Sequence, residues 1–567
     1  MVSAIFEKIP LLESLSEEEQ FEVQESHPKE RLKLLSDYSG RSVEQLLGQV
    51  AKVASIEIEA NPEFDPELVR EMPSRFVHAY HCLPLSGDDN GLLLGTVWPP
   101  DGLMDDWIFA TTGKSVSWKL VHPESVNRFV TEFFGVGSES FQDEEEELEE
   151  SLINLDEEDQ DAAIIRFVNE IIHQATEDKA TDIHIEPQAE ELRIRYRVDG
   201  GLVSIPVPDN LRRYQDAVIS RMKIMAKLNI SERRRPQDGR INYKAADSEI
   251  DIRLSTVPTL YGESVSLRLL NKKSKPLSFV QLGLPEEDRG TIDEVLGLPH
   301  GIVLVTGPTG AGKSTSLNAF IREVNSSDKR VITIEDPVEY EVEGVNQIQV
   351  NNEIEFGFSQ ALRHVLRQDP DIIMVGEMRD AETAEIGIQA SLTGHLVFST
   401  LHTNDAPGAL TRLIDMGIEP FLIASAIEMV IAQRLVRRLC TACAESYPFP
   451  HEEMVETLQS LRLDPAKGAG VTTLKRPAGC SQCRNTGYSG RIGIYEILRV
   501  DDHLHDLIVE RVSSRGVRKK ALEHGMRPLE ESGWILVKEG ITSLEEVFRV
   551  IEMDSSAEDA EALPLDG

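Results

Sequence analysis

Residues 302–315 read IVLVTGPTGAGKST, and this stretch decides how the second half of the chain folds. The apolar start predicts a buried strand, the glycine-rich run predicts a tight loop, and a helix is expected over 315–324. The loop follows the pattern GxxxxGK[ST], whose backbone N–H groups and helix N-terminus surround phosphate oxygens. Lys313 is expected to reach the β- and γ-phosphates and Ser314 to hold Mg²⁺. The expected nucleotide-binding residues are Gly307, Pro308, Thr309, Gly310, Ala311, Gly312, Lys313, Ser314 and Thr315.

Acidic residues follow two of the later strands. Apolar strands are expected over residues 330–334, 372–375 and 396–399. Because these strands alternate with helices, the sequence predicts a parallel α/β sheet. Glu335 and Glu339 come after the first strand and Glu377 after the second, where an acid beside such a loop binds Mg²⁺ or orients the attacking water. Any one of these acids could instead be only a helix cap.

A histidine flanks the last strand at each end. His402 follows the strand, so it is expected at the crevice where open α/β sheets bind ligands. There it could sense the γ-phosphate as a hydrogen-bond donor. The alternative is an ordinary core histidine, and only the position at a strand end favours the site. His395 precedes the same strand.

Four of the five cysteines form two CxxC pairs. These are Cys440 with Cys443 and Cys480 with Cys483, the pattern of a tetrahedral structural zinc site. The long interval between the pairs predicts an inserted subdomain over 440–490, clipped at its base by the metal. Free thiols or a redox pair are the alternative.

The chain is strongly acidic. Its 567 residues contain 98 Asp or Glu against 58 Lys or Arg, a formal net charge of −40. A nucleic-acid motor would therefore need a local basic track, and the nearest candidate, RRRPQDGR at 233–240, is short and lacks aromatic residues. Those arginines could neutralise a nucleotide held by a neighbouring domain or subunit, or form a solvated turn. No signal peptide or membrane-spanning run is visible, so any membrane link is expected to be peripheral or through a partner.

Composition and periodicity divide the chain into successive parts. Helical spacing is seen over 32–53, and the alternating segment 191–198 ends in the turn signal Asp199-Gly200. The expected parts are a mixed α/β N-terminal partner-docking domain (1–138), an acidic linker (139–160), an α+β second domain (161–275), a connector (276–284), a P-loop NTPase domain with the zinc subdomain and a helical C-terminal part (285–555) and a disordered tail (556–567).

Taken together, these motifs resemble those of the ATPases that power type II secretion and type IV pilus assembly. The resemblance runs from about Ala162 to about Ile551. It is carried by GPTGAGKST at 307–315, ITIEDPVEY at 332–340, LRQDPDIIMVGEMRD at 366–380, TGHLVFSTLHTNDA at 393–406 and RRRPQDGR at 233–240.

The resemblance implies a PAS-like domain followed by a RecA-like ATPase domain, repeated around a hexameric ring. It implies that Arg240 and Arg253 act in trans on a neighbour's nucleotide, that Glu335, Glu339 and Glu377 handle metal and water, and that His395 and His402 respond to the γ-phosphate. ATP, Mg²⁺ and structural Zn²⁺ are the implied cofactors. The location implied is cytoplasmic, peripheral at the inner membrane through a membrane platform and its docking protein.

The function that we expect from the sequence is ATP hydrolysis that drives pseudopilus assembly in type II secretion. Type IV pilus extension is the alternative within the same family. Two other classes stay open. One is a nucleotide-dependent scaffold in which turnover is incidental, and the other is a nucleic-acid translocase on a RecA-like core, which the charge balance disfavours.

Overall fold

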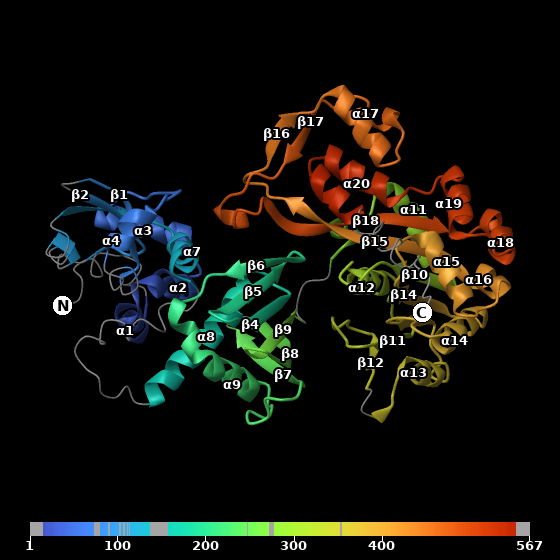
Figure 1. The fold of residues 1–567 in the computed structure, drawn as a ribbon, viewed down its shortest axis with the longest axis horizontal. Helices are drawn as coiled ribbons and strands as arrows, with labels where there is room; N and C mark the ends of the chain where they lie inside the picture. Colours follow the sequence, from blue (N-terminus) through green and yellow to red (C-terminus); the bar gives the residue numbers. More distant parts are fainter. Residues whose placement is uncertain are drawn as a thin grey trace. The chain divides into compact units, whose positions relative to one another are not determined.

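The fold is described from a computed structural model, in which the chain forms two compact units, Met1–Ile241 with Ile252–Leu269 and Asn242–Asp251 with Leu270–Gly567 (Figure 1). The residues described are 15–72, 77, 80–88, 91–100, 104–105, 108–109, 112, 114–135, 157–245, 248–271, 277–351 and 354–551. The expected tail (556–567) and most of the expected acidic linker (139–160) lie outside these residues. Within this described part, no helix is long and apolar enough to cross a membrane.

The N-terminal part is a mixed α/β assembly. Its elements are α1 (Glu17–Glu25), α2 (Pro28–Ser39), α3 (Val43–Ala54), α4 (Pro66–Glu71), β1 (Cys82–Gly87), β2 (Gly91–Thr96), β3 (Ser115–Leu120) and α7 (Pro123–Phe134). Strand β2 pairs antiparallel with β1 and parallel with β3. Buried side chains of the helices, among them Leu32, Leu46 and Val126, pack in one core with Leu83 of β1.

The helical spacing over 32–53 corresponds to two helices rather than one. Helix α2 ends at Ser39, and Gly40 adopts a left-handed conformation with φ 66°. Ser42 then caps α3, because its side chain accepts a hydrogen bond from the backbone N–H of Gln45. A left-handed glycine followed by a serine cap ends one helix and begins another without disturbing the apolar spacing.

The second domain is an α+β sheet of PAS type. Its elements are α8 (Glu157–Glu177), β4 (Asp182–Pro187), β5 (Leu192–Val198), β6 (Gly201–Ile205), α9 (Gln215–Met225), β7 (Gln237–Ala245), β8 (Ser248–Thr259) and β9 (Gly262–Asn271). The sheet order is β6-β5-β4-β9-β8-β7. Asp199 and Gly200 form the predicted turn between β5 and β6, both with positive φ (50° and 85°). Such a pair matches the strand twist of a tight hairpin.

A seven-stranded sheet forms the core of the domain that carries the predicted P-loop. Its order is β12-β11-β13-β14-β10-β15-β18. The strands are β10 (Gly301–Thr306), β11 (Val331–Glu335), β12 (Asn346–Gln349), β13 (Ile372–Val375), β14 (Leu396–Leu401), β15 (Ile427–Leu439) and β18 (Tyr488–Arg499). All neighbouring pairs from β12 to β15 are parallel, and β18 closes the edge antiparallel to β15. The predicted parallel α/β sheet is therefore confirmed.

Both faces of this sheet are covered by helices. Successive residues of β10 alternate between two cores: Ile302 and Leu304 lie in one, and Val303 and Val305 in the other. The first core also contains residues of α13 (Phe358–Val365), α14 (Ala381–Leu392), α15 (Ala406–Asp415), α16 (Pro420–Ala426), α18 (Asp502–Val509) and α19 (Ser514–Glu523). The second contains residues of α10 (Phe279–Leu282), α11 (Glu286–Leu296) and α12 (Lys313–Val324). Continuous apolar strands are expected when both faces are buried.

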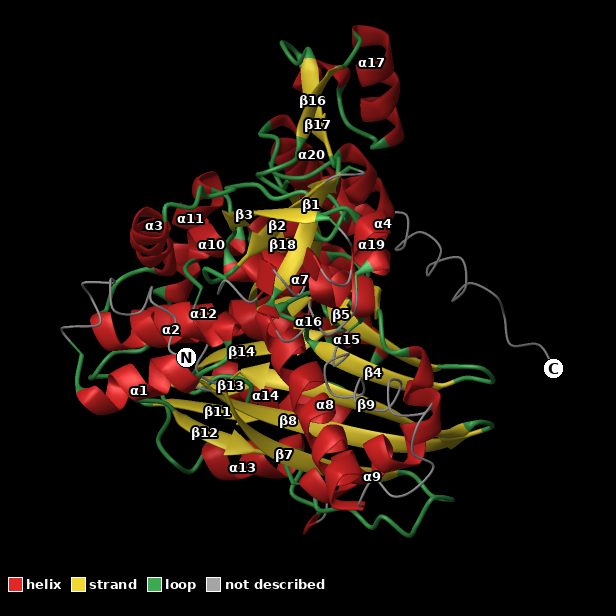
Figure 2. Ribbon diagram, turned by 90° about the vertical axis from the view of Figure 1, so that its left-hand side faces the viewer, coloured by secondary structure: helices red, strands yellow, loops and turns green. Residues whose placement is uncertain are grey.

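A small subdomain is inserted between the last two strands of the sheet. It holds the antiparallel pair β16 (Glu445–Pro448) and β17 (Thr473–Arg476) together with α17 (His451–Ser460). Both views show these elements projecting beyond the seven-stranded sheet, next to α20 (Leu529–Lys538) (Figures 1 and 2). Trp534 of α20 packs in one core with Met454 and Leu474 of the subdomain.

Candidate active site

The glycine-rich loop joins β10 to α12 at the carboxyl edge of the sheet. Gly307, Gly310 and Gly312 have φ values of 148°, 82° and 86°. A side chain at Gly307 would place Cβ 2.5 Å from the carbonyl oxygen of Gln433, so the loop lies directly on β15. At Gly310 a Cβ would meet nothing within 4 Å, and Pro308 and Thr309 are exposed. The backbone cradle is thus packed on one side and open on the other, as a phosphate-binding loop requires.

Lys313 is the first residue of α12, and its ammonium group is already engaged. It donates to the carbonyl oxygens of Gly307 (2.6 Å) and Pro308 (3.1 Å) and lies 3.5 Å from Nδ1 of His402. Burial lowers the pKa of Lys313 to about 8; the positive charge of Arg434 adds to this shift, and Glu377 opposes it. The lysine therefore occupies the mouth of the loop, where its charge would be compensated by phosphate oxygens.

Glu377, just past β13, is linked to this lysine through His402. Its carboxylate accepts from Nε2 of His402 (3.2 Å) and pairs with Arg379 (2.5 Å). Since Nδ1 of His402 faces the Lys313 ammonium, the hydrogen-bond network places the imidazole proton on Nε2. Burial alone would raise the pKa of Glu377, but the hydrogen bonds from Arg379 and His402 outweigh it and hold that pKa below its usual value. The acid is thus ionised at neutral pH.

Glu335 ends β11, two strands away from β14 in the same sheet. Its Oε1 accepts from the Thr333 hydroxyl (2.6 Å) and from Nε2 of Gln347 (3.0 Å). Burial raises the pKa of Glu335 above its usual value despite these hydrogen bonds, and the charge of Glu339 adds to the effect. Two acids at one sheet edge, one with a raised and one with a lowered pKa, suit different roles toward protons and metal.

The structure does not bring His395 to this edge. His395 stands before the first residue of β14, and its Nδ1 lies 2.8 Å from the carbonyl oxygen of Ala390 at the end of α14. Six residues of β14 separate it from the carboxyl edge, a span of about 20 Å at about 3.3 Å per residue. His395 is thus remote from Lys313 and Glu377 of the same chain, unlike His402.

Two residues beneath the site were not singled out by the sequence. Arg434 of β15 is only 3% exposed, and its guanidinium donates to the carbonyl oxygens of Asn404 (2.7 Å) and Gln433 (2.9 Å). Thr306, at the end of β10, accepts from the backbone N–H of Thr403 (2.8 Å). Thr306 thus fastens the loop that carries His402 to β10, the strand that leads into the P-loop, and Arg434 fastens the same loop to β15. An arginine inside the apolar run of β15 was the available signal, because buried charges need partners.

The predicted arginines lie on the six-stranded sheet of the other compact unit. Arg240 is on β7 and is exposed, and Arg253 is on β8 and is partly buried. The two strands are neighbours in that sheet.

The four cysteines meet at the base of the inserted subdomain. All four sulfur atoms lie within 4.8 Å of one another. The Cys483 sulfur accepts from the backbone N–H groups of Cys480 and Gly487, each at 3.2 Å. Gly487 has φ 76°, and a Cβ there would lie 2.3 Å from Pro477. Such tight knuckles with N–H···S contacts suit thiolates that share one tetrahedral ion, so the donor set fits zinc.

Comparison with known proteins agrees with this geometry. The family model described as "Type II/IV secretion system protein" matches residues 157–549, and the MshEN domain model matches residues 56–140. The chain is 43% identical to the type II secretion system protein E of Xanthomonas campestris over 497 residues, which cover 87% of this chain and 86% of the relative. It is 38% identical to the type IV pilus assembly ATPase PilB of Myxococcus xanthus over 496 residues, covering 86% and 87%.

Among solved structures, the Legionella pneumophila ATPase DotB matches with a TM-score of 0.50 at 22% identity, covering 68% of this chain and 95% of that one. At this identity the likeness concerns the fold. The family match spans more than half of the chain and includes the P-loop, both acid-bearing strand ends and the four cysteines. The chain belongs to the family of type II/IV secretion system proteins, and it is an ATP-hydrolysing member of that family.

Proposed function

We propose that this chain hydrolyses ATP to drive assembly of a pseudopilus during type II protein secretion. The observation that carries the proposal is the contact chain from Lys313 through His402 to Glu377. It joins the P-loop to the ends of two other strands, so that one edge of the sheet holds a cation for the phosphates, a hydrogen-bond donor and a carboxylate. This set is what phosphoryl transfer to water needs.

ATP binding would exchange the contacts that Lys313 makes now. Its ammonium leaves the carbonyl oxygens of Gly307 and Pro308 for the β- and γ-phosphates, and the P-loop N–H groups bind the remaining oxygens. His402, released from the lysine, is placed to donate to the γ-phosphate. The ionised Glu377 would orient the attacking water, and Glu335, whose pKa is raised, would be the better acceptor of its proton.

Ser314 and the acids at the strand ends are the groups that would hold Mg²⁺. Hydroxyl and carboxylate oxygens are the ligands that this ion prefers, and Glu339 is close enough to Glu335 to affect its pKa. When bound, Mg²⁺ neutralises charge that develops on the phosphate oxygens.

A ring of six copies would complete the site. Arg240 and Arg253 belong to the arginine-bearing sheet of the second domain and would contact the nucleotide of an adjacent copy. Charge compensation that depends on a neighbour makes turnover depend on assembly. Movement of the second domain against the ATPase domain would then be passed to a membrane platform and its docking protein.

Type II secretion is favoured over pilus extension by the comparison of two relatives across nearly the same span. Identity is 43% to the type II protein and 38% to the pilus protein. Deleting the gene from its host tests the choice: we expect secreted enzymes to be retained inside the cells and surface pili to persist. Loss of pili with normal secretion would favour pilus extension.

The tetracysteine cluster would hold one structural zinc ion per chain. With four protein ligands there is no open position for chemistry. Metal analysis of the purified protein should therefore give one zinc per chain. Protein with no metal and with all four thiols reactive would argue against a structural zinc site.

The test of the main proposal is ATP turnover measured against protein concentration, with Lys313→Ala as the control. We expect turnover per chain to rise as rings assemble and to vanish in the variant. Dilute monomers that are as active as assembled rings would contradict a site shared between copies. Absence of ATP turnover under all conditions would favour a nucleotide-dependent scaffold in place of a motor.

A further inference from the structure

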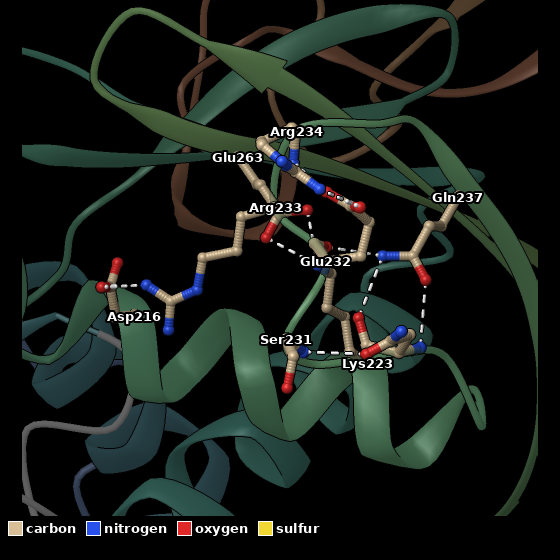
Figure 3. A network of polar contacts seen from close by, with 9 residues as sticks. Asp216, Lys223, Ser231, Glu232, Arg233, Arg234, Gln237 and Glu263 are labelled. Atoms are coloured by element: carbon tan, nitrogen blue, oxygen red, sulfur yellow. Dashed lines mark hydrogen bonds and ion pairs between the residues drawn. The ribbon is translucent and has the colours of Figure 1, made fainter.

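A buried lysine lies beneath the arginine loop, the segment 231–236 that precedes β7. Lys223 of α9 is only 1% exposed, and its ammonium group lies 2.6 Å from Oε1 and 2.7 Å from Oε2 of Glu263 on β9 (Figure 3). The same ammonium donates to the carbonyl oxygen of Glu232 in the loop (2.8 Å). Glu263 thus holds the cation in place, and the cation in turn holds the backbone of the arginine loop.

Gln237 fastens the loop from its other end. Its Nε2 donates to the carbonyl oxygens of Glu232 (2.9 Å) and Asn229 (3.0 Å), and its Oε1 accepts from the backbone N–H of Asn229 (3.0 Å). The Glu232 carbonyl therefore accepts from both Lys223 and Gln237, and it is the point at which the loop is tied to the domain (Figure 3).

The four arginines of the loop and of the start of β7 fall into two pairs. Arg233 donates to Asp216 of α9 (2.7 Å), and Arg234 makes three hydrogen bonds to the Glu232 carboxylate, through its backbone N–H (2.8 Å), Nε (3.1 Å) and Nη2 (3.0 Å) (Figure 3). Arg235 and Arg240 are exposed, and within the part of the chain that the structure describes neither side chain makes a hydrogen bond or an ion pair, although the charge of Arg235 acts on the Glu232 carboxylate. Acidic neighbours in the same domain thus pair with Arg233 and Arg234, whereas Arg235 of the loop and Arg240 of β7 keep side chains that can contact an anion outside the domain.

A buried ion pair is a poor way to gain stability. Taking two charges out of water costs about as much as their attraction returns, and well-packed apolar side chains often serve as well or better. The Lys223–Glu263 pair does supply something that an apolar pair cannot, namely a fixed donor for the Glu232 carbonyl at the centre of the loop.

We propose that Lys223 and Glu263 are positioning residues, which hold the arginine loop in the shape that presents Arg235 and Arg240 to the triphosphate of ATP on a second copy of this chain. This inference rests on the proposed function. It adds Arg235 to the cations of the composite site and assigns Arg233 and Arg234 to ion pairs within their own domain. It also gives the buried pair of Lys223 and Glu263 a role in turnover.

The test uses Lys223→Met/Glu263→Leu in the full-length protein. Because both charges are removed together and replaced by apolar side chains, the domain is expected to fold, with an unfolding midpoint within a few degrees of wild type. We expect kcat to fall roughly 10²-fold, less than the loss of an arginine finger, while the affinity for a fluorescent ATP analogue stays within about twofold. Lys227→Met makes the same lysine-to-methionine change at an exposed residue just past the end of α9 and is expected to keep wild-type kcat.

Mixing two inactive proteins separates positioning in trans from a structural defect. The double variant keeps an intact P-loop, and Lys313→Ala keeps an intact arginine loop. In randomly mixed rings made from equal amounts, about a quarter of the interfaces join a working P-loop to a working arginine loop, so turnover should recover to about a quarter of wild type. Wild-type kcat in the double variant, or no recovery on mixing, would overturn the proposal.

Two single substitutions test the division of the arginines. Arg235→Gln should lower kcat roughly tenfold or more, whereas Arg233→Gln should change it less than about twofold, because Arg233 is already neutralised by Asp216. Equal effects would contradict the division. The wild-type protein must first show ATP turnover that Lys313→Ala abolishes. If the wild-type protein shows no such turnover, the proposed function is refuted. If it does, and the double variant is as active as wild type, only the positioning role is refuted.

Discussion

The two ends of β14 carry two histidines from one short stretch of sequence, and only one of them lies in the site. His402, past the carboxyl end, contacts Lys313 and Glu377. His395, before the amino end, contacts the carbonyl oxygen of Ala390 instead. In a parallel sheet, every loop at the carboxyl edge meets the same crevice, whereas loops at the amino edge serve packing and connection. Nearness in sequence is therefore no guide to nearness to the nucleotide.

The carboxyl edge should be far more sensitive to substitution than the amino edge. The largest effect is expected for Glu377→Gln, which keeps the shape of the side chain but removes the charge that orients water. Turnover should fall roughly 10²–10⁴-fold with ATP binding retained. Single-turnover kinetics of assembled rings would measure it, and Glu385→Gln, at an exposed position of α14, is the matched control. Normal turnover in Glu377→Gln would leave Glu335 as the acid that acts on water.

A smaller loss is expected for His402→Ala. The substitution removes the donor placed for the γ-phosphate and also the hydrogen bond that holds Glu377. Turnover should fall roughly 10²-fold, in line with the loss of one preorganised donor. The measurement is kcat together with the affinity for ATP and ADP. If both affinities fell as much as kcat did, His402 would be a binding residue rather than one that acts in the reaction.

The protonation of Lys313 gives a pH effect of intermediate size. Burial lowers its pKa to about 8 in the free protein, and bound phosphates must raise that pKa because they favour the cation. Below pH 8 the lysine is already charged. Above pH 8 ATP binding should take up as much as about one proton, and affinity should weaken by up to about tenfold per pH unit. Calorimetry in two buffers of different ionisation enthalpy measures the uptake, and its absence at pH 9 would contradict the assignment.

The smallest effect on turnover is expected at the amino edge. His395→Ala should leave kcat within about twofold of wild type and lower the free energy of unfolding by about 1 kcal/mol, because one hydrogen bond to Ala390 is lost. His300→Ala, at an exposed histidine of the same edge, is the control and should change neither quantity. A loss of kcat in His395→Ala as large as that in His402→Ala would abolish the contrast, and it would imply that His395 reaches the nucleotide of another copy.

Much of the site could be predicted because its residues stand at strand ends. The run from 302 to 315 specifies a strand, a loop and a helix by local pattern alone, and β13 begins and ends where the apolar run IIMV does. Two CxxC pairs were enough to place four sulfurs together, because each knuckle is a local turn.

Other features depend on contacts between distant segments. That Arg434 fastens the His402 loop, or that Lys223 fastens the arginine loop, follows from pairings across β15 and β9 that no local pattern contains. The break between two helices at Gly40 is a local feature, but the apolar spacing does not reveal it because that spacing continues through the break.

The sequence by itself thus determined the chemistry: a phosphate-binding loop, acids after apolar strands, a four-thiolate cluster and a parallel sheet. The tertiary structure decided which residues share a place. It put His402 beside Lys313 and Glu377, left His395 at the far end of the strand, and divided the arginines into braced and available pairs. The physical reason is that strand and helix patterns depend on residues close together in the sequence, whereas the partner of a buried charge depends on how distant segments pack in the fold.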